Sequence, residues 1–180
     1  MSQLDQPLGK AAELRRAFDG MFAVQPIRPT EGIERFLAIR MGKNKYALRL
    51  GEIAGLAPAR KLVPLPSAMP ELLGLAGVRG NLVPVYDLAA LIGNESAAEN
   101  SRWLVLCGGT DSAALAFAEF DGYLELPSFA LHAIGKERAE RKHIREMLNV
   151  SDGGRGVISI PSLLETIRER IGVASTIEEH

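Results

Sequence analysis

The first segment of the chain has hydrophobic positions at the spacing of a helix. They are Leu14, Phe18, Met21 and Phe22, with charged residues between them. This pattern predicts a short amphipathic helix, which Gly20 weakens. Residues 25–32 contain two prolines and a glycine and are typical of a linker. We therefore expect an N-terminal extension over residues 1–32, which either packs on its own domain or serves as a partner-binding arm.

From residue 33 the hydrophobic period changes from that of a helix to the two-residue period of a strand. The alternating positions are Ile33, Leu37, Ile39 and Met41, then Tyr46, Leu48 and Leu50 after a turn at residues 42–44. This predicts a hairpin with one buried face. Residues 51–55 are expected to form a turn that leads into another extended piece. Residues 61–66 carry two prolines, so we expect an irregular or edge segment there.

The most informative stretch is residues 72–88. Two hydrophobic runs flank Arg79-Gly80-Asn81, which predicts a tight turn in which Gly80 adopts a positive φ. The second run ends at Asp87, whose carboxylate is suited to cap a short helix over residues 88–92. Gly93 is expected to end that helix.

Further short strands are predicted in the second half of the chain. They cover residues 103–107, 113–117, 123–126, 144–148 and 157–160, with turns at 108–111 and 153–154. The charged residues 135–143 are expected to form a solvated loop or helical turn. Pro161 suits the first turn of a C-terminal helix, Ser162 and Glu165 have capping-box spacing, and Leu163, Leu164, Ile167 and Ile171 form its apolar face. Many short strands with glycine turns favour small barrels over a sandwich of long strands.

Composition narrows the function classes. The 180 residues are 47% hydrophobic with a net charge of −1, and the isoelectric point is near 6.3. These values predict one domain or two small lobes and argue against a nucleic-acid binder. Cys107 is the sole cysteine, which excludes a disulfide framework and a multi-cysteine metal site. Without a secretory signal or a long apolar stretch, we expect a soluble protein of a reducing cytoplasm that does not insert into a membrane.

Catalytic motifs are missing from the sequence. The histidines are His132, His143 and His180, and none has metal-ligand spacing to another or to Cys107. There is no Gly-x-Ser-x-Gly motif, and the glycine clusters at residues 77–80 and 153–156 lack a phosphate-loop ending, so both are expected to be hairpin turns. We therefore expect no enzyme activity, cofactor or metal. Two interpretations of Arg79 stay open. It is either a solvated turn residue or an interface anchor, and arginine is enriched at interaction hot spots.

Residues 73–88 resemble the signature of CheW-like coupling proteins of bacterial chemosensory systems. The shared pattern consists of a glycine, three residues, an apolar residue, Arg-Gly, two residues, an apolar residue, proline, an apolar residue, any residue and Asp-Leu. It is carried here by Gly74, Arg79-Gly80, Pro84 and Asp87-Leu88. A weaker resemblance extends from Phe36 to about Ile171.

The resemblance implies a mainly β fold of two small five-stranded SH3-like barrels over residues 33–175, with short helices, a C-terminal helix and a tail at residues 176–180. It implies a cytoplasmic adaptor without catalytic activity, recruited to membrane-associated receptor arrays. Its partners would be the signalling tip of chemoreceptors and the regulatory domain of a CheA-type histidine kinase. The residues that it points to as partner-binding are Arg79, Gly74, Ile53, Val78 and Gly80.

Some positions depart from the family pattern. An acidic residue is frequent two positions after the one matching Ile53, whereas this chain has Gly55, and it has Leu115 where many members have glycine. These departures bear on the receptor partner more than on the fold. Two alternatives stay open: a relative that binds the kinase and competes with the coupling protein, and a small ligand-binding barrel or enzyme with a pocket between the lobes.

Overall fold

The chain divides into two units, Met1–Gly32 and Ile33–His180. The computed structural model describes residues 32–96, 98–108, 112–134 and 142–177, with side chains as far as residue 172. The predicted N-terminal helix and most of the predicted charged loop lie outside these residues. Within them, no helix combines the length and hydrophobicity needed to cross a membrane.

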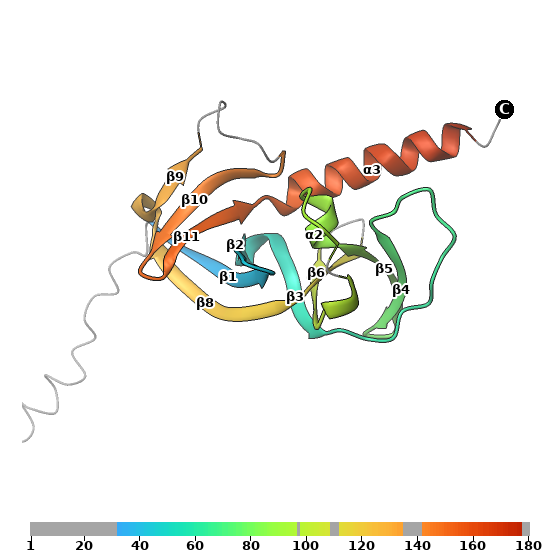
Figure 1. Cartoon of the computed structure of the whole chain (residues 1–180), viewed down its shortest axis with the longest axis horizontal. Coiled ribbons are helices and arrows are strands. Elements are labelled where there is room, and N and C mark those ends of the chain that lie inside the picture. The colour runs from blue at the N-terminus through green and yellow to red at the C-terminus, as the bar shows by residue number, and fades with distance from the viewer. Residues whose placement is uncertain (1–31, 97, 109–111, 135–141, 178–180) are drawn as a thin grey trace, which may run out of the picture. The chain divides into compact units, whose positions relative to one another are not determined.

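Six strands form a mixed sheet in the order β8-β1-β2-β11-β10-β9 (Figure 1). Their bounds are β1 Ile33–Met41, β2 Asn44–Arg49, β8 Glu119–Pro127, β9 Leu131–Ala133, β10 Ile144–Val150 and β11 Gly153–Ile158. All neighbouring strands are antiparallel except β2 and β11, which run parallel. The chain therefore begins and ends its β structure in the same sheet.

Five strands from the middle of the chain form the second sheet, in the order β3-β6-β7-β5-β4. Their bounds are β3 Ile53–Pro58, β4 Leu72–Val78, β5 Asn81–Asp87, β6 Trp103–Cys107 and β7 Ala113–Phe117. Here β5 and β7 are the parallel pair. The β3–β4 connection, residues 59–71, is irregular as predicted and pairs with β4 at Val63 and Leu75.

Short helical turns and one long helix complete the domain. They are the 3-10 turns Leu50–Glu52, Ala98–Asn100 and Ser128–Ala130, and the α-helices α2 Leu88–Leu91 and α3 Ile160–Ile177. Asp87 caps α2 as predicted, since its Oδ1 accepts from the Ala89 amide at 2.9 Å. The predicted capping box of α3 is wrong. The first amide, Ile160 N–H, donates to Glu52 at 3.0 Å, and Ser162 N–H donates to the Ser159 hydroxyl.

Three clusters of buried side chains hold the fold together. The shared cluster lies between the sheets and under α3, and includes Leu37, Ile39, Tyr46, Leu48, Val105, Leu115, Phe117, Leu163 and Ile167. The second lies within the five-stranded sheet and the third within the six-stranded sheet. This arrangement confirms the predicted mainly β fold of two SH3-like barrels with a shared core and a C-terminal helix. One sheet has a sixth strand, the three-residue β9.

The first hairpin is buried on both faces, so the prediction of a single buried face is wrong. Leu37 and Leu48 belong to the shared cluster, whereas Phe36 and Ala47 lie in the cluster within the six-stranded sheet. Alternation of hydrophobic and polar residues does not mark such strands, because a barrel covers one face and the neighbouring lobe covers the other.

Residues 153–156 form part of strand β11 rather than the predicted turn, which lies at Ser151 and Asp152. Side chains of β10 pack closely over two glycines of this strand. A Cβ on Gly154 would lie 3.0 Å from the Met147 methyl, and one on Gly156 would lie 3.0 Å from Ile144 Cγ2. Gly156 is buried, and the two side chains nearest to it, Ile144 and Tyr46, belong to the shared cluster, so this glycine serves close packing against that cluster.

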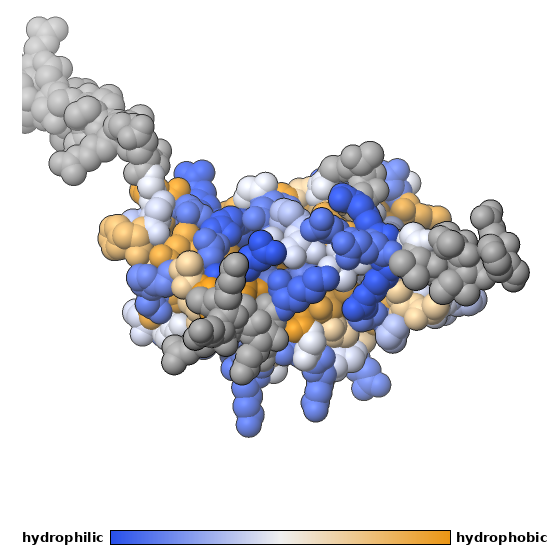
Figure 2. Space-filling model, turned by 90° about the horizontal axis from the view of Figure 1, so that it is seen from above, coloured by the Kyte–Doolittle hydropathy of each residue, from blue (hydrophilic) through white to orange (hydrophobic). Residues whose placement is uncertain are grey.

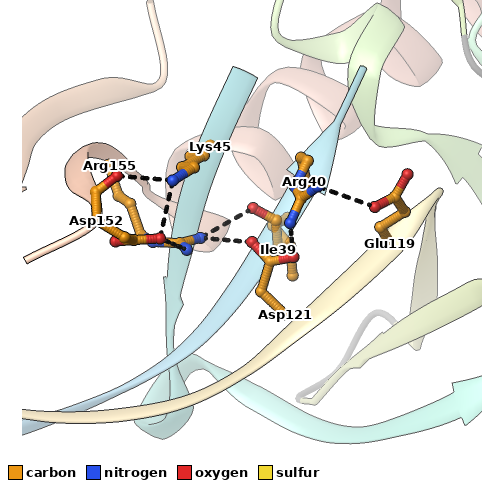
Figure 3. Close-up of polar contacts among 7 residues, drawn as sticks. All are labelled: Ile39, Arg40, Lys45, Glu119, Asp121, Asp152 and Arg155. Carbon is orange, nitrogen blue, oxygen red and sulfur yellow. Dashed lines mark hydrogen bonds and ion pairs between the residues drawn. The ribbon is translucent and has the colours of Figure 1, made fainter. Parts of the chain in front are cut away.

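The side chain of Arg155 is the centre of a charged network (Figure 3). It donates to Asp121 at 3.0 Å and to Asp152 at 2.7 Å, and it is almost fully buried. Asp121 also accepts from Arg40 at 2.7 Å. The register of β1 against β8 shifts beside Asp121, so this residue is a bulge whose carboxylate turns towards Arg155. The network joins β1, β8 and β11.

Candidate partner-binding surface

The β4–β5 hairpin ends in a strained two-residue turn. Val78 pairs with Asn81, and the residues between them, Arg79 and Gly80, have φ values of 50° and 84°. Positive φ at both positions defines a type I′ turn, in which Asn-Gly is the favoured pair. The positive φ predicted for Gly80 is confirmed. Arg79 is the single non-glycine residue with positive φ in the part of the chain that the structure describes, and this conformation costs roughly 1–2 kcal/mol.

The Arg79 side chain extends from this turn to the opposite edge of the same sheet. Its Nη2 atom lies 3.2 Å from the position that a Cβ on Gly55 would occupy. Because β3 and β4 are the two edge strands of the five-stranded sheet, this contact joins the end of one edge strand to the other through a side chain. Arg79 is exposed, and among the described residues its guanidinium has no hydrogen bond or ion pair.

Gly74 is buried beneath the β3–β4 connection. A Cβ at this position would lie 2.3 Å from the Val63 carbonyl oxygen, and the φ of Gly74 is 137°. The two hydrogen bonds between Val63 and Leu75, both 2.8 Å, depend on this close approach. Gly74 therefore holds the connection in place and offers no side chain to a partner.

The other predicted partner-binding residues differ in their exposure. Val78 is 6% exposed and belongs to the core of the five-stranded sheet, and Gly80 is exposed at the turn. Ile53 is half-buried at the start of β3, where it packs against the shared cluster and pairs with Cys107. The structure brings the Ile53 segment and Arg79 together through Gly55, two residues further along β3.

An exposed apolar face lies on the same hairpin, and the sequence analysis did not identify it. We define the hairpin face as Val63, Leu75, Leu82 and Pro84. Val63 pairs with Leu75 and Leu75 with Pro84, while Leu82 lies two positions from Pro84, so all four lie on one side of the sheet. Leu82 is 71% and Val63 59% exposed. Apolar side chains grouped in this way are typical of protein–protein interfaces. The alternation along β5 could have indicated this face, because Val83 and Val85 are buried and Leu82 and Pro84 alternate with them.

A second apolar surface lies where the two sheets meet. Phe120 stacks edge-on between Trp103 of β6 and Tyr123 of β8, with ring centroids 5.9 Å and 5.4 Å apart. Tyr123 is 62% exposed. Trp103 pairs with Pro58, the last residue of β3, so this aromatic edge borders the same strand as Gly55. Figure 2 shows a face of the molecule on which hydrophilic side chains cover much of the middle and hydrophobic ones lie between them and towards the ends.

The cysteine and one of the histidines singled out in the sequence are buried. Cys107 is buried, and burial raises its pKa to about 12. His143 is buried and lies 3.0 Å from the Ser162 hydroxyl. Across the described ranges, no three His, Cys, Asp or Glu side chains are grouped for a metal ion.

A cleft of about 740 Å³ lies beside α2 and the β1–β2 turn, and its charged lining residues are Lys43, Glu95, Arg102 and Glu119.

Comparison with known proteins gives a consistent result. Residues 35–170 match the family model of the CheW-like domain. The chemotaxis protein CheW of Rhizobium meliloti (strain 1021) is 29% identical over 80 residues, which are 43% of this chain and 50% of that protein. The match thus spans half of the curated relative. The scaffolding protein TtCheW from Thermoanaerobacter tengcongensis has a similar solved structure, with a TM-score of 0.63 and 13% identity over 71% of this chain and 89% of that chain. At 13% sequence identity, this structural similarity shows that the two proteins share a fold.

Proposed function

The chain belongs to the CheW-like domain family, and on this premise we propose that it is a non-catalytic adaptor that couples chemoreceptors to a CheA-type histidine kinase. Its partners are the signalling tip of the receptors and the regulatory domain of the kinase. It acts in the cytoplasm, at membrane-associated receptor arrays. A chemotaxis-type signalling pathway is the setting that the curated relative supports.

The observation that carries this proposal is the strained conformation of Arg79. A non-glycine residue at φ 50° in an exposed turn is destabilising, and Asn or Gly would remove the strain. Strain of this kind concentrates at functional sites. Arginine is also among the residues enriched at binding hot spots, and here it borders the exposed hairpin face. An arginine at this position of the turn therefore favours partner binding at the expense of the stability of the fold.

The predicted partner-binding residues then have two roles. Arg79 and Gly80 are exposed and contact a partner directly, and half-buried Ile53 does so at the start of β3. Gly74 and Val78 are buried and act as supports, because they position the β3–β4 connection and the hairpin. Substitution of the supports should affect stability before it affects affinity.

Size-exclusion chromatography with light scattering tests the proposal. The full chain is mixed with the kinase regulatory domain from the same organism, and then with a receptor signalling fragment. We expect the wild-type chain to form a stable complex. In Arg79→Ala the binding free energy should be less favourable by about 2 kcal/mol. Failure of the wild-type chain to bind either partner would refute the adaptor function.

A second function is favoured by Gly55. The glycine leaves Arg79 without a neighbouring acidic side chain, and a surface changed in this way suits a protein that binds the kinase but not the receptors. Such a protein would compete with a coupling protein. Binding of the kinase domain together with no binding of any receptor fragment from the organism would support this second function.

A further inference from the structure

The first amide of helix α3 takes its acceptor from a distant part of the chain. The first amides of a helix have no acceptors within the helix and need partners elsewhere. The residue after Ile160 is a proline without an N–H group, and the two after that donate to the hydroxyl and the carbonyl oxygen of Ser159. Ile160 is the remaining donor, and its N–H donates to Glu52 Oε2 at 3.0 Å.

The Ile160 amide depends on this carboxylate. Ile160 is 1% exposed, so water does not replace Glu52 as the acceptor, and a buried donor without an acceptor is costly. The negative charge of Glu52 also lies at the N-terminus of the helix, where the helix dipole favours it. The position of the Glu52 side chain relative to α3 is therefore well defined.

Glu52 lies where the chain crosses from the six-stranded sheet to the five-stranded sheet. It ends the 3-10 turn Leu50–Glu52, and Ile53 follows directly as the first residue of β3. β3 is an edge strand, and its register against β6 shifts between Ile53 and Gly55. The start of β3 is thus held by one neighbouring strand, beside an irregularity, and the bond from Glu52 to α3 is a second attachment.

We propose that Glu52 is a positioning residue for partner binding, which through its bond to α3 fixes where the start of β3 presents Ile53. This inference rests on the proposed adaptor function, in which Ile53 contacts a partner, and it adds a residue that acts through Ile53. The side chain of Glu52 is half-buried and its carboxylate is engaged within the chain. Its contribution to binding is therefore indirect.

Glu52→Ala and Glu52→Gln form a matched pair for testing this role. Alanine removes the acceptor, whereas the amide oxygen of glutamine still accepts from Ile160 N–H although the charge is lost. Ser162→Ala is the control for a loosened helix, because it removes the contact of Ser162 with His143 at the same end of α3 and leaves Glu52 in place.

Two measurements are made on each full-length protein. Isothermal titration calorimetry gives its affinity for the kinase regulatory domain and for a receptor signalling fragment, separately. Hydrogen exchange followed by NMR reports whether the Ile160 amide has kept its acceptor.

For the partner that contacts Ile53, Glu52→Ala should bind about fivefold more weakly, and Glu52→Gln and Ser162→Ala should stay within about twofold of the wild type. The Ile160 amide should exchange faster in Glu52→Ala and at the wild-type rate in Glu52→Gln. Both Glu52 variants are expected to fold, because at most one hydrogen bond of a half-buried side chain is lost. Should Glu52→Ala be unfolded, Glu52→Asp, which keeps the charge on a shorter side chain, replaces it with the same expectations.

The outcomes separate this inference from the proposed function. Wild-type affinity of Glu52→Ala for both partners, or an unchanged exchange rate of its Ile160 amide, would overturn the positioning role while the adaptor function stands. Equal losses of affinity in Glu52→Ala and Glu52→Gln would also overturn it, since they would make Glu52 a direct charged contact. An equal loss in Ser162→Ala would assign the effect to a loosened α3 instead. Absence of binding by the wild-type chain to both partners would overturn the adaptor function and the positioning role together.

Discussion

At the scale of single residues, Arg79 shows a conflict between stability and binding. Its backbone occupies the left-handed region, where arginine is unfavourable and asparagine is tolerated. Arg79→Asn should therefore raise the free energy of unfolding by about 1 kcal/mol, measured by urea denaturation, while it weakens binding to the kinase domain or the receptor fragment.

Arg79→Ala is the control, because it removes the guanidinium and keeps a residue for which positive φ is unfavourable. It should weaken binding without the gain in stability. A loss of stability in Arg79→Asn would contradict the account, since it would show that Arg79 supports the fold.

His143 gives a prediction about pH. Burial, and then the positive charges of Lys142, Arg170 and Arg145, lower its pKa below the usual 6.5. The native state therefore binds fewer protons than the unfolded state near this pH. Stability from this residue is complete above about pH 6.5 and falls as the pH drops towards the folded-state pKa.

Urea denaturation at about pH 7.5 and about pH 5.5 measures this effect. The fall in unfolding free energy between the two should be smaller in His143→Gln than in the wild type. His132→Gln is the control, because His132 is exposed. A wild-type fall that persists unchanged in His143→Gln would assign the pH dependence to other groups.

At the scale of elements, Gly74 determines how the β3–β4 connection packs. In Gly74→Ala the new methyl group would meet the Val63 carbonyl at 2.3 Å in a backbone with φ 137°. We expect a loss of at least about 2 kcal/mol in unfolding free energy, because the connection must move and the backbone is strained. Gly77→Ala lies in the same strand with open space around it and should be nearly neutral. Similar losses in the two variants would refute the close-approach explanation.

The cap of α2 is a second prediction at this scale. The Asp87 carboxylate accepts from the Ala89 and Ala90 amides and from the Ser96 hydroxyl. Asp87→Ala should lower the unfolding free energy by about 1–2 kcal/mol, and Asp87→Asn by less, because the amide oxygen still caps the helix. Thermal melts followed by circular dichroism would show this order. Equal losses would mean that the negative charge, rather than the cap, is what matters.

Elements were predictable from the sequence where the signal is local. Gly80, Asp87 and Gly93 act at one turn each, and their roles follow from backbone geometry and side-chain chemistry alone. The glycines of β11 were mistaken for a turn because their cause is the packing of Met147 and Ile144 from a neighbouring strand. Ile171 was predicted on the apolar face of α3, but it is 47% exposed, because the hydrophobic contacts of the helix end before it.

At the scale of the whole molecule, the sequence motif indicated the two barrels, while the candidate surface depends on contacts between distant segments. The Arg79 side chain reaches Gly55 of β3, and the bridge from Val63 to Leu75 completes the hairpin face. Neither contact has a periodic signal in the sequence, since each joins segments that lie apart along the chain. For this reason Arg79 was recognisable as unusual, whereas Gly55, Val63 and Leu82 were not identified as its neighbours on a surface.

The measurement that tests the central claim most directly is recruitment of the kinase. Vesicles that display a receptor signalling fragment are sedimented with the CheA-type kinase, in the presence and absence of this protein. The account predicts that the kinase pellets with the vesicles when the wild-type chain is present, and much less with Arg79→Asn. A kinase that stays in the supernatant with the wild-type chain, or pellets equally without it, would contradict the adaptor function.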